Sequence, residues 1–205
     1  MKKKVFFLLV AILMAGYAHA QVRIGVSGGL NYANKLFYIP AASTSMGTQM
    51  KPGFQAGVVL ENNIGQSDNV SSQVGLSFVS QECKFREGII YGSADETLSM
   101  TYIRIPIRYL YKIDLSDMKL LLQGGVDLGL AVAGKIKHDN MEEKIKFSSD
   151  GISRFETIFG LGPGLQFGNF QAVLEYNIGY NSGSSNIMMF NNGFAFNLTY
   201  FFFNK

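Results

Sequence analysis

The chain has 205 residues, of which 18 are Lys or Arg and 15 are Asp or Glu, and its sequence pI is about 8.9. Three of the basic residues stand in Lys2–Lys4, ahead of an apolar run, Val5–Met14, and a small-residue cleavage site, Ala18–Ala20, which together are typical of a secretory signal. Without residues 1–20 the chain carries 15 basic and 15 acidic residues, so no basic patch for nucleic acid is expected.

We expect residues 1–20 to be a removed signal peptide, because the apolar run is shorter than the roughly 20 residues of a membrane-spanning helix. No Cys follows the cleavage site, so no lipid anchor is expected there. Residues 21–205 have the length of one domain. Their single cysteine, Cys83, excludes an intrachain disulfide, and we expect it to be reduced and inert near a strand end.

Beyond the signal, apolar and polar residues alternate in segments of about ten residues, a period that predicts β-strands. The last segment sets Phe194, Phe196 and Leu198 on one side, with Ala195 and Asn197 on the other. An aromatic, amphipathic strand of this kind is typical of the strand that closes an outer-membrane barrel. Eight strands are predicted: Val22–Tyr32, Gly53–Glu61, Val70–Gln81, Leu98–Ile113, Met118–Gly134, Arg154–Phe167, Phe170–Tyr180 and Gly193–Phe203.

The predicted connections alternate between long loops and short turns. Outer-membrane barrels show this asymmetry, with short periplasmic turns and long extracellular loops, and an even strand number then places both termini in the periplasm. The predicted long loops are Ala33–Pro52, the segment around Glu87–Asp95, Lys135–Gly151 and Asn181–Asn192, and the short turns are Asn62–Asn69, Asp114–Asp117 and Gly168–Asn169.

Alternation alone leaves open which face is inside, because a soluble eight-stranded barrel holds its apolar face inward. Glycines decide between the two, because they lie on the polar face, where a water-facing strand would carry larger polar residues. A narrow membrane barrel instead needs small inward residues beside a few large polar ones. We therefore predict an all-β fold, an eight-stranded antiparallel up-and-down transmembrane β-barrel. The glycines are Gly25, Gly29, Gly53, Gly57, Gly75, Gly125, Gly129, Gly160, Gly162, Gly164, Gly179 and Gly193.

Eight charged residues fall on the inward face. By strand direction, Arg23 and Glu61 are neighbours near the periplasmic end, and Arg104 and Asp127 are neighbours near mid-height, so we expect two salt bridges. Eight strands normally enclose an interior filled by side chains, so we expect the charges to plug the lumen, with an ion or proton path as the alternative. The eight are Arg23, Glu61, Arg104, Arg108, Asp127, Arg154, Glu156 and Glu175.

No catalytic, cofactor or metal site is predicted, and we expect no enzyme. The domain contains one histidine, His138, in a charged loop, and no strand places a histidine beside an inward Ser. One Cys and one His cannot build a transition-metal site. The glycine-rich Gly160–Gly164 lacks the Lys-Ser/Thr of a phosphate-binding loop.

The loops are the candidate functional surface, open to a protein or glycan partner. Lys135–Lys146 mixes both signs of charge, as expected of either a binding surface or a solvated tip. Met188, Met189 and Phe190 form an apolar run in a predicted loop. They would fold over the mouth of the barrel, extend the strands or contact another protein.

Three features occur together: a Gly-rich first strand, Ile24–Asn31, an Ile-Pro core in a middle strand, Tyr102–Tyr109, and an aromatic C-terminal strand. In these the whole of 21–205 resembles the outer-membrane β-barrel proteins of the PorT-like family. The resemblance implies an integral outer-membrane barrel of the Bacteroidetes type, whose namesake takes part in protein secretion and gliding. Pro106 in the Ile-Pro core lacks a backbone N–H, so we expect a bulge there.

We expect a monomeric barrel with a plugged lumen and a structural or binding role through its extracellular loops. Its expected partners are outer-membrane lipid and, during insertion, the barrel-assembly machinery. Two alternatives stay open: a narrow channel for small solutes or ions, and an accessory of a protein-secretion machinery.

Overall fold

The computed structural model describes residues 22–39, 43–64, 69–85, 96–138, 141–147, 153–182 and 188–204. The predicted signal peptide, residues 1–20, lies outside these ranges, as does most of the predicted loop around Glu87–Asp95. Within the described part, no helix has the length and apolarity to cross a membrane.

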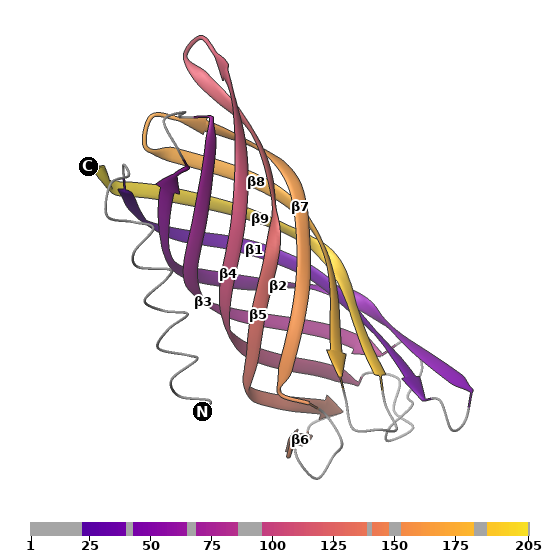
Figure 1. The fold of residues 1–205 in the computed structure, drawn as a ribbon. Coiled ribbons are helices and arrows are strands. Elements are labelled where there is room, and N and C mark those ends of the chain that lie inside the picture. Colours follow the sequence, from indigo (N-terminus) through magenta and orange to yellow (C-terminus); the bar gives the residue numbers. More distant parts are fainter. Residues whose placement is uncertain are drawn as a thin grey trace, which may run out of the picture.

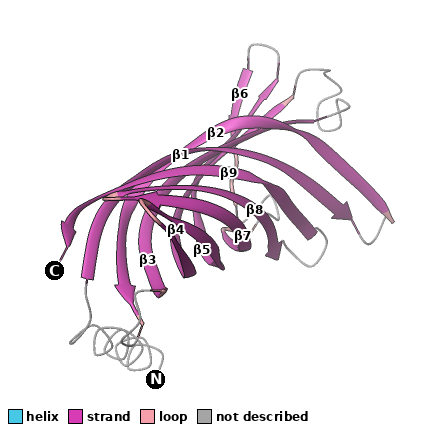
Figure 2. Ribbon diagram, turned by 90° about the horizontal axis from the view of Figure 1, so that it is seen from above, coloured by secondary structure: helices cyan, strands magenta, loops and turns pink. Residues whose placement is uncertain are grey.

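Eight antiparallel strands form one closed ring in which every neighbour in space is a neighbour in sequence, apart from the closing pair. The first and last strands, β1 and β9, close the ring, and the short β6 pairs only with the loop-end part of β5. Figures 1 and 2 show the strands tilted around a common axis, with β6 and the C-terminus at opposite ends. The strands are β1 Val22–Ile39, β2 Thr44–Asn63, β3 Val70–Phe85, β4 Thr97–Leu115, β5 Met118–His138, β6 Met141–Lys144, β7 Phe155–Phe167, β8 Phe170–Ser182 and β9 Met188–Asn204.

The pairing register fixes the dimensions of the ring. A path of paired residues that leaves β1 at Arg23 crosses Glu61, Gln73 and Arg108 and, after the remaining strands, returns to β1 at Ala33. The return point is ten residues further along, which is a shear number of ten. With strands about 4.8 Å apart and a rise of about 3.3 Å per residue, this gives a tilt of about 40° and a radius of about 8 Å.

The face prediction is confirmed, because apolar side chains cover the outside and charged side chains fill the inside. Large apolar residues such as Leu76, Ile105 and Phe159 are about half exposed or more on the outer face, whereas Glu61 is fully buried within the ring. This inverted distribution suits lipid outside and a polar lumen, the arrangement of a transmembrane barrel.

The strands are longer than predicted at the end of the ring that carries β6, here called the loop end. Ala33–Pro52 is not a loop, because β1 continues to Ile39 and β2 starts at Thr44. Lys135–Gly151 also contains strand, since β5 continues to His138 and pairs with β6. At this end the inward face carries buried apolar side chains such as Met189, as the outward face does, so the alternation that marks a strand in the sequence is lost.

The bulge expected at Pro106 is absent. The register between β3 and β4 is the same on either side of it, with Val74 opposite Ile107 and Ser77 opposite Arg104. Gly75 accommodates the proline ring, because a Cβ added there would lie 3.1 Å from Pro106 Cγ. The register shift of this strand lies instead towards β5, between Thr101 and Tyr102.

Charge on the outer face is expected to destabilise the barrel according to depth. Leu76→Lys, near the middle of β3, should lower the free energy of unfolding in lipid vesicles by about 2–4 kcal/mol, measured by urea titration. Tyr38→Lys, near the loop end of β1, is the matched control and should cost about 0–1 kcal/mol. Equal costs at the two positions would contradict a membrane placed around the middle of the ring.

Candidate functional site

The lumen is closed by side chains near the end where β7 turns into β8, here called the turn end. Glu61 accepts hydrogen bonds from Arg23 at 3.0 Å, from Lys112 at 2.7 Å, and from Gln73 and Gln171 at 2.6 and 2.8 Å. These five residues, the Glu61 cluster, come from β1, β2, β3, β4 and β8, so they join strands across the ring. The pairing of Arg23 with Glu61 is the one expected from strand direction.

The next layer towards the loop end centres on Arg108. It forms ion pairs with Asp127 and, at 2.7 Å, with Glu175. Arg104 pairs above it with Glu156 at 2.5–2.7 Å. The expected salt bridge between Arg104 and Asp127 is therefore wrong. Asp127 stands opposite Pro106, between the two arginines, and pairs with Arg108, whereas β7 brings Glu156 to Arg104.

Small inward residues give these charges their space, as the glycine argument required. A Cβ added to Gly129 would lie 2.6 Å from Glu156 Cγ, and one added to Gly160 would collide with the Glu175 carboxylate. Each glycine thus stands opposite a carboxylate of the lumen. The bore is too narrow for a side chain at both positions.

Arg154, expected in the lumen, lies outside it. It precedes β7, is exposed, and its guanidinium stands 5.0 Å from the centroid of the Phe147 ring. The strand begins at Phe155, so Arg154 is a residue of the loop-end rim. A one-residue error at a strand boundary is enough to move a side chain from the interior to the surface.

Two inward residues of this region were missed by the sequence analysis. Lys35 is 3% exposed and donates a hydrogen bond from Nζ to the Tyr102 hydroxyl at 3.0 Å. The same ammonium lies 5.2 Å from the centroid of the Tyr102 ring. Lys35 falls in the segment predicted as a loop, so its inward direction had no signal, and Tyr102 was named only as the first residue of the Ile-Pro core.

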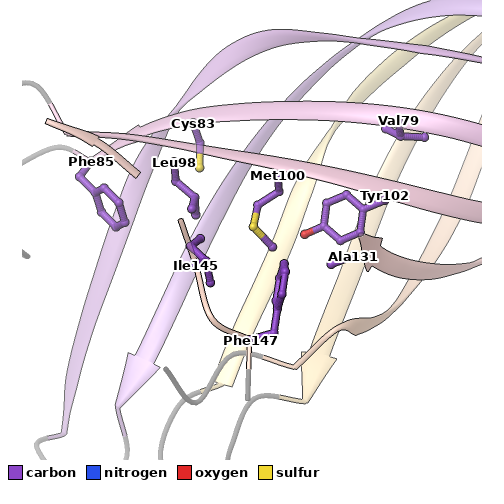
Figure 3. Close-up of a cluster of buried hydrophobic side chains, with 9 residues drawn as sticks. All are labelled: Val79, Cys83, Phe85, Leu98, Met100, Tyr102, Ala131, Ile145 and Phe147. Carbon is purple, nitrogen blue, oxygen red and sulfur yellow. The ribbon is translucent and has the colours of Figure 1, made fainter. Parts of the chain in front are cut away.

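An apolar cluster fills the loop end of the lumen (Figure 3). Most of its members project inward from β3, β4 and β5, and Ile145 and Phe147 enter from the segment after β6. Cys83 is buried in this cluster and is a free thiol, as expected. The cluster consists of Val79, Cys83, Phe85, Leu98, Met100, Tyr102, Ala131, Ile145 and Phe147.

A cavity of about 90 Å³ extends across the middle of the lumen. This is room for several water molecules, since one needs about 10–15 Å³. Arg104, Arg108 and Asp127 contribute to its wall, and side-chain amide groups supply much of the rest. The amide residues are Asn31, Gln55, Gln73, Gln81, Gln123, Gln171, Asn177, Asn191 and Asn197.

The hairpin of β5 and β6 carries exposed charges outside the ring. Glu142 pairs with Lys137 at 2.9 Å and with Lys135 at 3.3 Å. The hydrogen bond from Lys137 is the main cause that lowers the pKa of the Glu142 carboxyl below its usual value. His138 ends β5, and no cluster of His, Cys, Asp or Glu among the described residues has the arrangement of a metal site.

Met188, Met189 and Phe190 extend a strand, one of the three outcomes considered for them. They begin β9 and pair with Tyr38, Phe37 and Leu36 of β1. Met189 is buried inside, and the Phe190 ring faces outward, 5.6 Å between centroids from Tyr180. Because these residues continue the barrel wall, the predicted loop Asn181–Asn192 is wrong at both ends.

The sequence matches the family described as outer membrane protein beta-barrel domain over residues 17–200. The chain therefore belongs to this family of outer-membrane β-barrel proteins. No curated protein matches the sequence.

Solved structures with a similar arrangement include Neisserial surface protein A, at 11% identity over 87% of this chain and 97% of that one, with a TM-score of 0.47. Ail of Yersinia pestis is 15% identical over 88% of this chain and 99% of that one, with a TM-score of 0.35. The outer membrane protease OmpT from Escherichia coli is 9% identical over 89% of this chain and 97% of that one, with a TM-score of 0.45. These scores are too low to support any inference about function.

Glu61→Gln should lower the free energy of unfolding by about 3–5 kcal/mol, because it leaves Arg23 and Lys112 buried without their anion. Urea titration in lipid vesicles measures this loss. Asp114→Asn is the matched control, since it removes the carboxylate of an exposed pair with Lys119 at 3.0 Å and should cost at most about 1 kcal/mol. Similar losses for both variants would show that the Glu61 cluster does not hold the ring together.

Proposed function

We propose that the protein is a closed, non-conducting outer-membrane barrel that acts as a structural or binding protein through its loop end. The observation that carries this proposal is the Glu61 cluster, in which a fully buried carboxylate joins side chains from opposite walls of the lumen. Opening the lumen there requires two cations and a carboxylate to separate without water, at a cost of several kcal/mol.

The orientation proposed here puts both termini in the periplasm and the hairpin of β5 and β6 at the cell surface. Support comes from the tight turns at Ser116–Asp117 and Gly168–Asn169, which share the end opposite β6. Residues 1–20 act as the signal peptide in this proposal. The proposal includes no enzymatic activity.

Within the family of outer-membrane barrels, the proposal assigns the chain to the PorT-like proteins that its sequence resembles. The chain acts as a monomer surrounded by outer-membrane lipid. A protein or glycan partner would meet the exposed hairpin, where Met141 is 66% exposed. A role in secretion machinery is not carried over, because no described contact favours it.

A channel for small solutes or ions is the second candidate, and the central cavity is the observation that favours it. Planar-bilayer recording separates the two. The closed barrel predicts no current steps above the bare bilayer for the purified protein. Steps whose size changes in Arg104→Ala or Asp127→Ala, but not in the rim variant Lys119→Ala, would establish the channel.

Cysteine labelling in intact cells tests the orientation. Met141→Cys should react with a membrane-impermeant maleimide, because β6 stands outside the ring at the proposed cell surface. Asp117→Cys should react only after the outer membrane is permeabilised. Cys83 is 2% exposed and should give little background in the unsubstituted protein. The reverse labelling pattern would show that the barrel has the opposite orientation in the membrane.

A further inference from the structure

The apolar cluster contains two side chains, Ile145 and Phe147, that do not come from the strands of the barrel wall. Val79 and Cys83 project from β3, Leu98 and Met100 from β4, and Ala131 from β5, so the part of the wall formed by these three strands is apolar at this level. The centre is occupied by Ile145 and Phe147, which belong to no strand of the ring (Figure 3). The strands therefore shape an apolar site that the chain fills with two side chains of its own.

The segment that carries Ile145 and Phe147 is hydrogen-bonded to the barrel wall at β5. Ile145 donates a backbone hydrogen bond to the carbonyl of Gly134 at 2.9 Å. A Cβ on Gly134 would lie 3.0 Å from Ile145 and 3.2 Å from Phe147, so the fit depends on the absence of a side chain there. The guanidinium of the exposed Arg154 lies 5.0 Å from the centroid of the Phe147 ring. The atom nearest such a Cβ is Met100 Sδ, at 2.9 Å, so a larger residue at position 134 would press on the wall at β4 as well as on the segment.

Two hydrogen-bond donors stand at the base of this site. The Lys35 ammonium has three hydrogens and one hydrogen bond, to the Tyr102 oxygen, and within the described ranges no carboxylate lies within 4.0 Å of it. The Tyr102 hydroxyl accepts that bond, so its own hydrogen remains to be donated. Figure 3 shows this hydroxyl directed towards Met100 and Phe147. The hydrogen-bond partner of this buried cation is neutral, and the Glu156 carboxylate attracts it only from beyond 4.0 Å, so an anion at this point would add a direct ion pair and further offset the cost of burial.

We propose that the loop end of the lumen binds an amphipathic carboxylate. The carboxylate accepts hydrogen bonds from Lys35 Nζ and the Tyr102 hydroxyl, and the apolar tail replaces Ile145 and Phe147 against Met100 and Leu98. A tail such as that of decanoate matches the volume of these two side chains. Ligand and segment compete for one site, so binding expels the segment that follows β6 and shifts the population of the surface hairpin. This proposal stands apart from conduction, since the Glu61 cluster is untouched.

A decanoate with a diazirine at its tail tests the site on the whole barrel in lipid nanodiscs, with adducts mapped by mass spectrometry. Adducts on inward residues such as Met100 report the site, whereas adducts on outward residues such as Leu76 report the bilayer. We expect inward adducts that unlabelled decanoate competes away. Phe147→Ala should raise them several-fold, because it removes one of the two side chains that fill the site.

Lys35→Met should reduce the inward adducts at least tenfold and leave the outward ones unchanged. Lys119→Met, at the turn end, is the matched control and should change neither. Lys35→Arg should restore labelling, and Tyr102→Phe, which keeps the ring, should reduce it. Each barrel is first shown to be folded. Inward adducts that are absent in both the wild type and Phe147→Ala would overturn the proposal. Inward adducts that are equal in Lys35→Met and wild type would also overturn it.

Discussion

The narrow bore of an eight-stranded ring with a shear of ten brings most of the charges inside it into contact with partners of opposite sign. At a radius of about 8 Å, measured to the backbone, inward side chains from opposite walls touch, and little water remains to solvate an ion. Glu61 accordingly reaches residues on β1, β3, β4 and β8 at once. Arg108 holds two carboxylates from different strands. The same contacts that satisfy the charges tie the walls together.

The polarity of the side chains that line the lumen changes along the axis of the barrel. Near the turn end the lumen is ionic, in the middle it is lined by amides around a cavity, and at the loop end it becomes apolar. The apolar level is completed by residues after β6, so the surface hairpin and the interior of the barrel are physically connected through Ile145 and Phe147. A change at one is transmitted to the other because they share this short segment.

The sequence contained enough information for the strand number, the faces and one salt bridge, because these depend on the period of two. Gly129 and Gly160 marked the inward face since a narrow lumen has no space there for a side chain. The partner of Arg104 could not be derived, because the stagger between strands decides whether Asp127 or Glu156 is nearer. Lys35 and Ile145 were missed for another reason: they lie where strands leave the membrane and alternation ends. Arg154 shows that a boundary misplaced by one residue reverses a side chain's environment.

The central property of the molecule is a closed barrel with its apolar face in lipid and its charges inside. Fractionation of cells, followed by gel electrophoresis in SDS with and without boiling, tests this directly. A band in the outer-membrane fraction that migrates differently before and after boiling is the predicted result, because a closed ring of strands resists SDS until heated. An unshifted band in the soluble periplasmic fraction would contradict the account, and would require the apolar face to line an internal ligand cavity instead.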